Sequence, residues 1–171
     1  MKERKPQHTG LWESILKALY NVRINSDIDT AIEYSTELFQ NANSTIWIVG
    51  GNLNNDLWGA PEVINELEEA SNRNIEIRII HGPSIDPNNL EITRLHEEGR
   101  IELQSHSINP SSKFIVVDKS HVRLEEVGTG SAQRSAFVVT ESAMLGNRLA
   151  KDFTKLWQTP KLMAEGTIVR N

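Results

Sequence analysis

The order in which two hydrophobic periods alternate along the chain is the strongest constraint on its fold. Residues 26–29 (SDID) have the side chains of a capping box, and apolar residues at helical spacing follow them. Residues 44–51 (STIWIVGG) form a short run rich in β-branched residues, which is typical of a buried strand. This order then repeats, so we expect a sheet whose first strands are parallel and joined by crossover helices.

The second half of the chain has a different pattern, with three strand-like runs joined by short turns. Such short connections favour antiparallel neighbours. The sequence therefore predicts an α/β fold with a mixed, mostly parallel sheet flanked by helices. The expected strands are 44–51, 75–80, 100–104, 113–117, 122–127 and 135–140, and the expected helices are 11–20, 28–42, one beginning at Pro61, 87–99 and 143–157.

Length and composition indicate one globular domain. The chain has 171 residues, of which 38% are apolar and 24% charged. We expect residues 1–10 to be a flexible tail and residues 11–171 to form the domain. No cysteine is present, which excludes disulfides, a thiolate nucleophile and zinc–sulfur sites. The chain has neither a signal-peptide pattern nor an apolar run long enough to cross a membrane, so we expect a cytoplasmic protein with no transmembrane segment.

The charge is unevenly distributed. The net charge of −5 argues against a nucleic-acid footprint over the whole surface. Residues 61–102 hold ten acidic and four basic side chains, whereas residues 1–23 hold five basic and two acidic ones. A local basic face is compatible with this distribution, and so are ordinary solvated helix faces.

The stretch with the most chemical content is residues 111–120 (SSKFIVVDKS). Lys113 and Asp118 bracket four apolar residues, which is also what the two ends of any buried strand look like. Together with the order of the elements, however, this stretch resembles the phospholipase D superfamily. The resemblance extends from about residue 28 to residue 157. It includes the STIWIVGG strand, the LEEASNRNIEIRII helix and strand, the RIELQ strand, the KFIVVD segment and the final helix ending in LAKDFTKLW.

The family signature is His-x-Lys, four residues, then Asp, and this sequence departs from it at the first position. Lys113 and Asp118 match at the right spacing, but Ser111 stands where the family has histidine. The resemblance implies that the missing histidine would be the nucleophile, while the lysine would hold phosphate oxygens. A serine needs a neighbouring base to act as a nucleophile, whereas the charge and hydrogen bonds of the lysine require no histidine. We therefore expect Lys113 to be a retained anion contact, with Ser111 and Asp118 shaping the site.

A second departure follows the motif. The family often has Gly-Ser-x-Asn starting seven residues after the aspartate, where this chain has Glu125 and Glu126. Two carboxylates beside a phosphate site would oppose an anionic ligand. A Gly-Ser-Ala-Gln stretch occurs five residues later, so that Ser131 and Gln133 are either a displaced remnant of this motif or part of an ordinary turn.

Further candidates are loop residues and histidines. His106 and His121 flank the motif and are the candidate bases for Ser111, although such histidines are commonly exposed loop residues. Asn52 and Asn54 follow the first expected strand, at the edge where open α/β sheets bind ligands. Trp58 is expected in a loop, where it is a candidate contact. The spacing of the histidines is not that of a metal site, and neither a metal nor a cofactor is indicated.

Two hypotheses of different classes follow. The first is a non-catalytic phospholipase D-like domain that binds a phosphate-bearing ligand, nucleic acid among them, or a protein partner. The alternative is a divergent, metal-independent phosphodiesterase or nuclease that uses Ser111 with His106 or His121. A regulatory ligand-binding domain is a third possibility. The resemblance also implies a homodimer, because single-motif members of the superfamily usually pair, with Lys113 near the interface.

Overall fold

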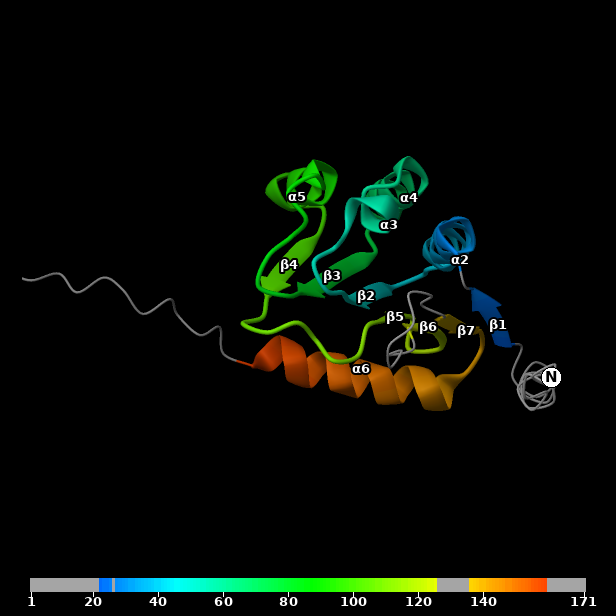
Figure 1. Cartoon of the computed structure of the whole chain (residues 1–171). Helices are drawn as coiled ribbons and strands as arrows, with labels where there is room; N and C mark the ends of the chain where they lie inside the picture. Colours follow the sequence, from blue (N-terminus) through cyan, green and yellow to red (C-terminus); the bar gives the residue numbers. More distant parts are fainter. Residues whose placement is uncertain (1–21, 26, 126–135, 160–171) are drawn as a thin grey trace, which may run out of the picture.

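A computed structural model describes residues 22–25, 27–125 and 136–159 of the chain. The expected tail at 1–10 and helix at 11–20 lie outside these ranges. The described residues form one seven-stranded sheet between two layers of helices (Figure 1). The strands are β1 (Val22–Asn25), β2 (Thr45–Val49), β3 (Glu76–His81), β4 (Glu102–Ser105), β5 (Phe114–Val117), β6 (His121–Glu125) and β7 (Ala136–Val139). The helices are α2 (Ile28–Gln40), α3 (Asn55–Trp58), α4 (Pro61–Asn72), α5 (Leu90–Glu97) and α6 (Ala143–Gln158).

The strand order is β1-β7-β6-β5-β2-β3-β4, and the sheet is mixed. Strands β2, β3 and β4 are parallel, as the crossover helices predict. The expectation of a mostly parallel sheet is wrong, because four of the six described pairings are antiparallel. The reason is that two antiparallel pairs lie outside the sequence pattern: β5 pairs with β2 at the centre of the sheet, and the outermost strand β1 pairs with β7.

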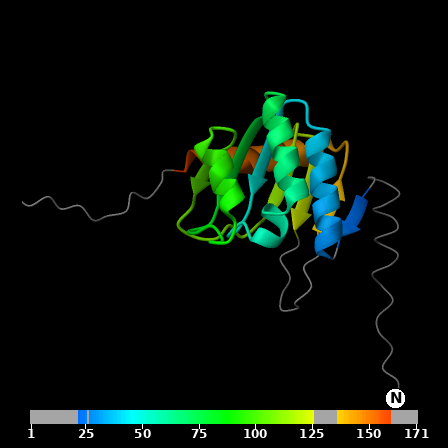
Figure 2. The ribbon, with the colours of Figure 1, turned by 90° about the horizontal axis from the view of Figure 1, so that it is seen from above.

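The helices divide between the two faces of the sheet. Helices α2, α4 and α5 lie side by side across one face, and of the described helices only α6 crosses the other (Figures 1 and 2). Alternate residues of each strand point to opposite faces. Ile48 and Ile115 accordingly belong to the core beneath the first helix layer, whereas Val49 and Phe114 belong to the core beneath α6.

The ends of the helices follow from local sequence. Asp27 caps α2, since its side chain accepts a hydrogen bond of 2.8 Å from the backbone N–H of Thr30. Pro61 occupies the first turn of α4, as predicted. Helix α5 ends near Gly99, whose φ of +72° is in the left-handed region that favours glycine.

Two contacts fix α6 against the sheet. Trp47 of β2, Phe153 and Trp157 form a stack, with ring centroids 5.0 and 5.6 Å apart. Near the start of the helix, Gly146 lies against the backbone of Lys119 in the β5–β6 turn, where an added Cβ would be 2.1 Å from the Lys119 carbonyl oxygen. Close approach of helix and turn therefore requires the glycine.

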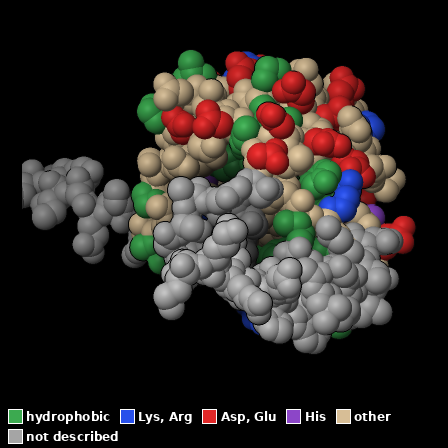
Figure 3. All heavy atoms as spheres, turned by 45° about the vertical axis from the view of Figure 1, so that its right-hand side comes forward, with side chains coloured by type: hydrophobic (Ala, Val, Ile, Leu, Met, Phe, Trp, Pro, Cys, Tyr) green, Lys and Arg blue, Asp and Glu red, His purple; other side chains and the backbone are tan. Residues whose placement is uncertain are grey.

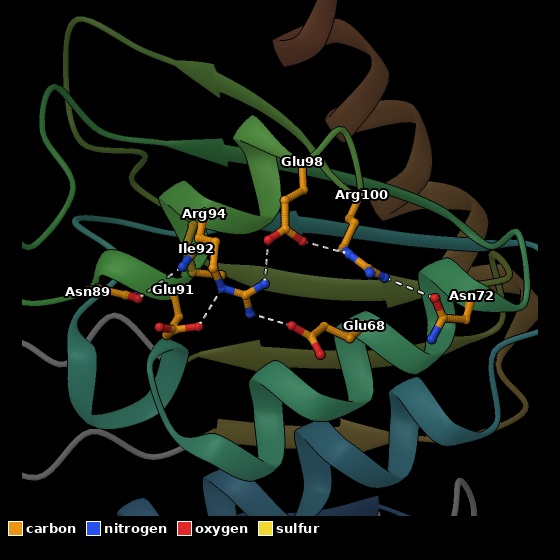
Figure 4. Close-up of polar contacts among 8 residues, drawn as sticks. All are labelled: Glu68, Asn72, Asn89, Glu91, Ile92, Arg94, Glu98 and Arg100. Atoms are coloured by element: carbon orange, nitrogen blue, oxygen red, sulfur yellow. Dashed lines mark hydrogen bonds and ion pairs between the residues drawn. The ribbon is translucent and has the colours of Figure 1, made fainter.

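An arginine joins α4 to α5 in the first helix layer. Arg94 binds Glu68 of α4 and, within the α5 region, Glu91 and Glu98, the last two each at 2.8 Å (Figure 4). These carboxylates raise the pKa of Arg94, through the hydrogen bond with Glu68 above all. None of the described helices is long and apolar enough to cross a membrane.

Candidate functional site

The candidate site lies at the edge of the sheet where the parallel strands end. Strands β2 and β3 both reach this edge at their carboxyl ends, and β5 begins there because it runs antiparallel to β2. The loops after β2 and β3 and the connection before β5 therefore meet at one edge. This is the position at which open α/β sheets commonly bind ligands.

The first two of these loops are bound to each other. The Gly82 N–H donates to the Gly51 carbonyl at 2.8 Å, and the Asn89 side chain donates to the Leu53 carbonyl at 2.9 Å. The Asp86 carboxylate accepts from the N–H groups of Asn88 and Asn55, both at 3.0 Å. These hydrogen bonds, led by that from Asn88, hold the pKa of Asp86 below its usual range. The loop after β2 is thus fixed in shape by its neighbour.

A hollow opens between this loop, α3 and the strands β5 and β6. Its polar lining consists of the Gly50–Gly51 backbone, Asn52, Asn54, Lys113, Arg123 and Glu125, and its apolar lining of Val49, Leu53, Trp58, Phe114 and Ile115. The expected ligand contacts Asn52, Asn54 and Lys113 are therefore together. Trp58 is not in a loop as expected: it belongs to the short helix α3 and is 5% exposed, so it serves as a buried wall of the hollow.

Lys113 enters the hollow from the start of β5. Its side chain passes over Gly51, where an added Cβ would lie 2.9 Å from Cε and 3.0 Å from Nζ. None of the described carboxylates lies within 4 Å of this ammonium, so it forms no ion pair with them. A lysine held over backbone and unpaired in this way is available to an anion.

Arg123 is the site residue that the sequence reasoning missed. It lies opposite Ile115 in β6, its side chain is 5% exposed, and its Nη1 contacts Oε1 of Glu125 at 3.0 Å. Its Nε is buried without a hydrogen-bond partner among the described residues. Burial of a cation with an unsatisfied donor is costly, and because Arg123 also lines the hollow, its guanidinium is a candidate ligand contact. The available signal was an arginine inside an apolar strand, between Val122 and Leu124.

Asp118 lies at the other end of β5 and does not share the hollow. One of its oxygens accepts from the N–H groups of Ser44 and Thr45, both at 2.9 Å, and the other accepts from the Asn43 N–H at 2.8 Å. Burial by itself raises the pKa of Asp118, but these hydrogen bonds outweigh it and hold the pKa below its usual value. The carboxylate thus fastens the α2–β2 loop to the β5–β6 turn.

The histidines that flank the motif are bonded elsewhere. His106 contacts the Leu156 carbonyl at 3.1 Å, at the end of α6. His121 pairs with Val117 across β5 and β6, near Asp118, and its Nδ1 accepts from the Glu141 N–H at 3.4 Å. Ser111 is exposed in the β4–β5 connection and is not among the residues that line the hollow. Ser131 and Gln133 lie outside the described residues.

The face of the molecule that the first helix layer covers is acidic. Acidic side chains gather on the outer side of the molecule where the first helix layer lies (Figure 3). Exposed examples are Asp29, Glu33, Glu62 and Glu69 of α2 and α4. This face repels a polyanion, so a polyanionic ligand would be disfavoured there. In the part of the chain that the structure describes, no cluster of three or more His, Asp or Glu residues is arranged to hold a metal ion.

Comparison with solved structures shows the fold. The chain superposes on Nuc of Salmonella typhimurium, a phospholipase D family member, with a TM-score of 0.63 and 16% identity over 80% of this chain and 93% of Nuc. NucT from Helicobacter pylori superposes with a TM-score of 0.58 and 13% identity over 80% of this chain and 94% of NucT. The architecture of the described residues is therefore phospholipase D-like.

A third structural neighbour is a larger protein. TrmBL2, an archaeal chromatin protein that binds DNA, superposes with a TM-score of 0.66 and 12% identity over 86% of this chain. The chain spans only 59% of the length of TrmBL2. No protein-family model matches the sequence, and no curated protein matches it in sequence. At these identities, the likenesses establish the fold alone.

Proposed function

We propose that this chain is a phospholipase D-like binding domain without phosphodiesterase activity, and that it binds a phosphate-bearing ligand in the hollow through Lys113. The observation that carries this proposal is that a lysine and a buried arginine line the same hollow. Lys113 lacks an ion pair with any described carboxylate, and Arg123 has a buried donor without a described partner. Phosphate oxygens would form charge-assisted hydrogen bonds with the Lys113 ammonium and with the part of the Arg123 guanidinium that lines the hollow.

The loop after β2 supports the same ligand. Gly50 donates to the Ile80 carbonyl and Asn55 to Asp86, whereas the N–H groups of residues 51–54 have no acceptor among the described residues. Consecutive free N–H groups in a tight loop form a concavity that favours anions. The loop also contains Leu53, a buried non-glycine residue with a φ of +49°, and such strained conformations cluster at ligand sites.

The absence of phosphodiesterase activity is proposed on the chemistry of Ser111. A serine attacks phosphorus only when a base takes its proton. The hydrogen bonds of His106 and His121 lead to Leu156 and Glu141 instead. The enzyme hypothesis requires a histidine hydrogen-bonded to Ser111, and neither His106 nor His121 makes that bond.

Binding is tested by titrating the protein with inorganic phosphate and measuring heat. We expect saturable binding to the parent, a loss of roughly tenfold or more in affinity for Lys113→Met, and no loss for Lys155→Met. Lys155 is the matched control because it is an exposed lysine near the end of α6. Equal affinities for all three proteins would contradict the proposed site.

Hydrolysis of bis(p-nitrophenyl) phosphate without added metal tests the second half of the proposal. We expect no activity from the parent. Activity gained by Ser111→His would mean that the phosphate pocket is intact and that only the nucleophile is missing. Activity of the parent that Ser111→Ala abolishes would establish the alternative, a serine-dependent phosphodiesterase.

We further propose that two copies pair with Lys113 near the two-fold axis, and that nucleic acid is one candidate source of the phosphate. Light scattering at micromolar concentration tests the first proposal, and a monomer contradicts it. For the second, single-stranded DNA should bind with a strong dependence on salt, because each phosphate contact releases counterions. If single-stranded DNA does not bind, or binds with an affinity that does not depend on salt, nucleic acid is not the source of the phosphate.

A further inference from the structure

A carboxylate lies inside the hollow that we assign to an anion. Glu125 lines it with its side chain 18% exposed, and its backbone N–H donates to the Lys113 carbonyl at 3.0 Å. Residues directly opposite in antiparallel strands have side chains on the same face, with Cβ atoms roughly 5 Å apart. Lys113 and Glu125 both line the hollow, so a ligand bound there lies beside both.

An ionised carboxylate only accepts hydrogen bonds. It opposes a bare phosphate, which has negative charge and few protons to donate. Arg123 offsets part of this charge through Oε1 of Glu125, and the described residues supply no donor to Oε2. The carboxylate therefore favours a ligand that presents a hydrogen-bond donor next to its phosphate.

Two other polar side chains of the hollow can also accept a hydrogen bond from a ligand. Asn52 and Asn54 each carry an amide that both donates and accepts, and neither amide is hydrogen-bonded to another described residue. Trp58 adds a flat apolar wall. A molecule that carries hydroxyl groups as well as a phosphate suits this lining, which offers a carboxylate acceptor, two amides and an aromatic wall beside two cations.

We infer that the ligand is a hydroxyl-bearing organic phosphate, whose phosphate contacts Lys113 and Arg123 and whose hydroxyl donates to Glu125. This inference rests on the proposed function, since it assigns the remainder of the same ligand. Glu125 is then a specificity-determining residue: it opposes phosphates without a donor and stabilises those with one.

Two probes of equal charge and similar length test the inference. Glycerol 3-phosphate carries two hydroxyls, and propyl phosphate carries none. We expect the parent to bind glycerol 3-phosphate roughly tenfold to a hundredfold more tightly than propyl phosphate, the range for a hydrogen bond to a charged group. In Glu125→Ala this ratio falls toward one, because glycerol 3-phosphate loses its hydrogen bond to the carboxylate, whereas the removal of the negative charge favours both phosphates alike. Glu97→Ala, which removes an exposed glutamate from α5, keeps the parental ratio.

The outcomes separate the two proposals. Binding of both probes that depends on Lys113 but shows no preference for glycerol 3-phosphate overturns the inference and leaves the phosphate site in place. A preference that persists in Glu125→Ala, and also in Glu125→Gln as a second variant closer in shape, overturns the role of Glu125. Failure of both probes and of inorganic phosphate to bind removes the proposed function itself.

Discussion

Lys113 and Asp118 stand at opposite ends of strand β5, about 16 Å apart along the chain direction. One side chain enters the hollow at the loop edge, and the other binds the backbone of residues 43–45 at the far edge. The two matched positions of the motif are therefore expected to have separable effects, one on binding and one on stability.

Replacing Asp118 with alanine should destabilise the fold and leave phosphate binding unchanged. The substitution removes the acceptor of three backbone N–H groups, and we expect a loss of about 2 kcal/mol in the free energy of unfolding. Urea unfolding measures it. Asp152→Ala is the control, because its ion pair with Arg148 is exposed and should contribute little. Unchanged stability together with lost phosphate binding would place Asp118 in the ligand site after all.

The contribution of Asp118 should also depend on pH. Its pKa is lowered in the folded state from a value near 3.8, so the folded protein holds this proton less tightly than the unfolded chain. The stabilisation is therefore present above the unfolded pKa and is lost as the pH falls through the lower folded pKa. We expect the difference in unfolding free energy between the parent and Asp118→Asn to be largest near about pH 6 and to shrink below about pH 3. The difference isolates Asp118 from other acids with lowered pKa values, such as Glu98. A difference that grows on acidification contradicts this account.

Strands β2 to β7 were predictable because each has a local pattern. The run at 44–51 is apolar and β-branched, and β2 occupies 45–49 of it. Strand β1 was missed because four residues, Val-Arg-Ile-Asn, carry too little pattern, and their pairing with β7 is long-range. The excess of antiparallel pairs was missed for a related reason. Nothing local in the sequence shows that β2 and β5 meet at the centre of the sheet.

The site was partly predictable. Lys113, Asn52 and Asn54 follow from the motif and from the position of loops at the ends of parallel strands, and all three line the hollow. Arg123 could not be assigned, because alternation along β6 does not reveal which of its two faces lies toward the hollow. Once Ile115 is known to lie beneath the first helix layer, its partner Arg123 must lie there too.

Gly146 should not tolerate a side chain. In an exposed helix, replacing glycine with alanine stabilises by about 1 kcal/mol. Here the added Cβ would meet the Lys119 carbonyl, so helix and turn must separate, and we expect a net loss of about 1–3 kcal/mol. Thermal unfolding measures the effect, with Lys151→Ala, an exposed position of the same helix, as the control. A rise in melting temperature for Gly146→Ala would mean that this contact is looser than the structure indicates.

The β5–β6 turn should also favour glycine over a side chain. Asp118 and Lys119 have φ values of +51° and +55°, and the Ser120 N–H donates to the Val117 carbonyl at 3.1 Å. These are the features of a type I′ turn, which favours glycine at its second central position. A lysine there is strained, so Lys119→Gly should stabilise the protein by about 0.5–1 kcal/mol. The lysine also lies over the Trp47 ring, 5.7 Å from its centroid, and Lys119→Ala removes that contact while keeping the strain. In urea unfolding, Lys119→Gly should therefore exceed both the parent and Lys119→Ala in stability. If glycine and alanine behave alike, the cation over Trp47, and not the turn, determines the preference at this position.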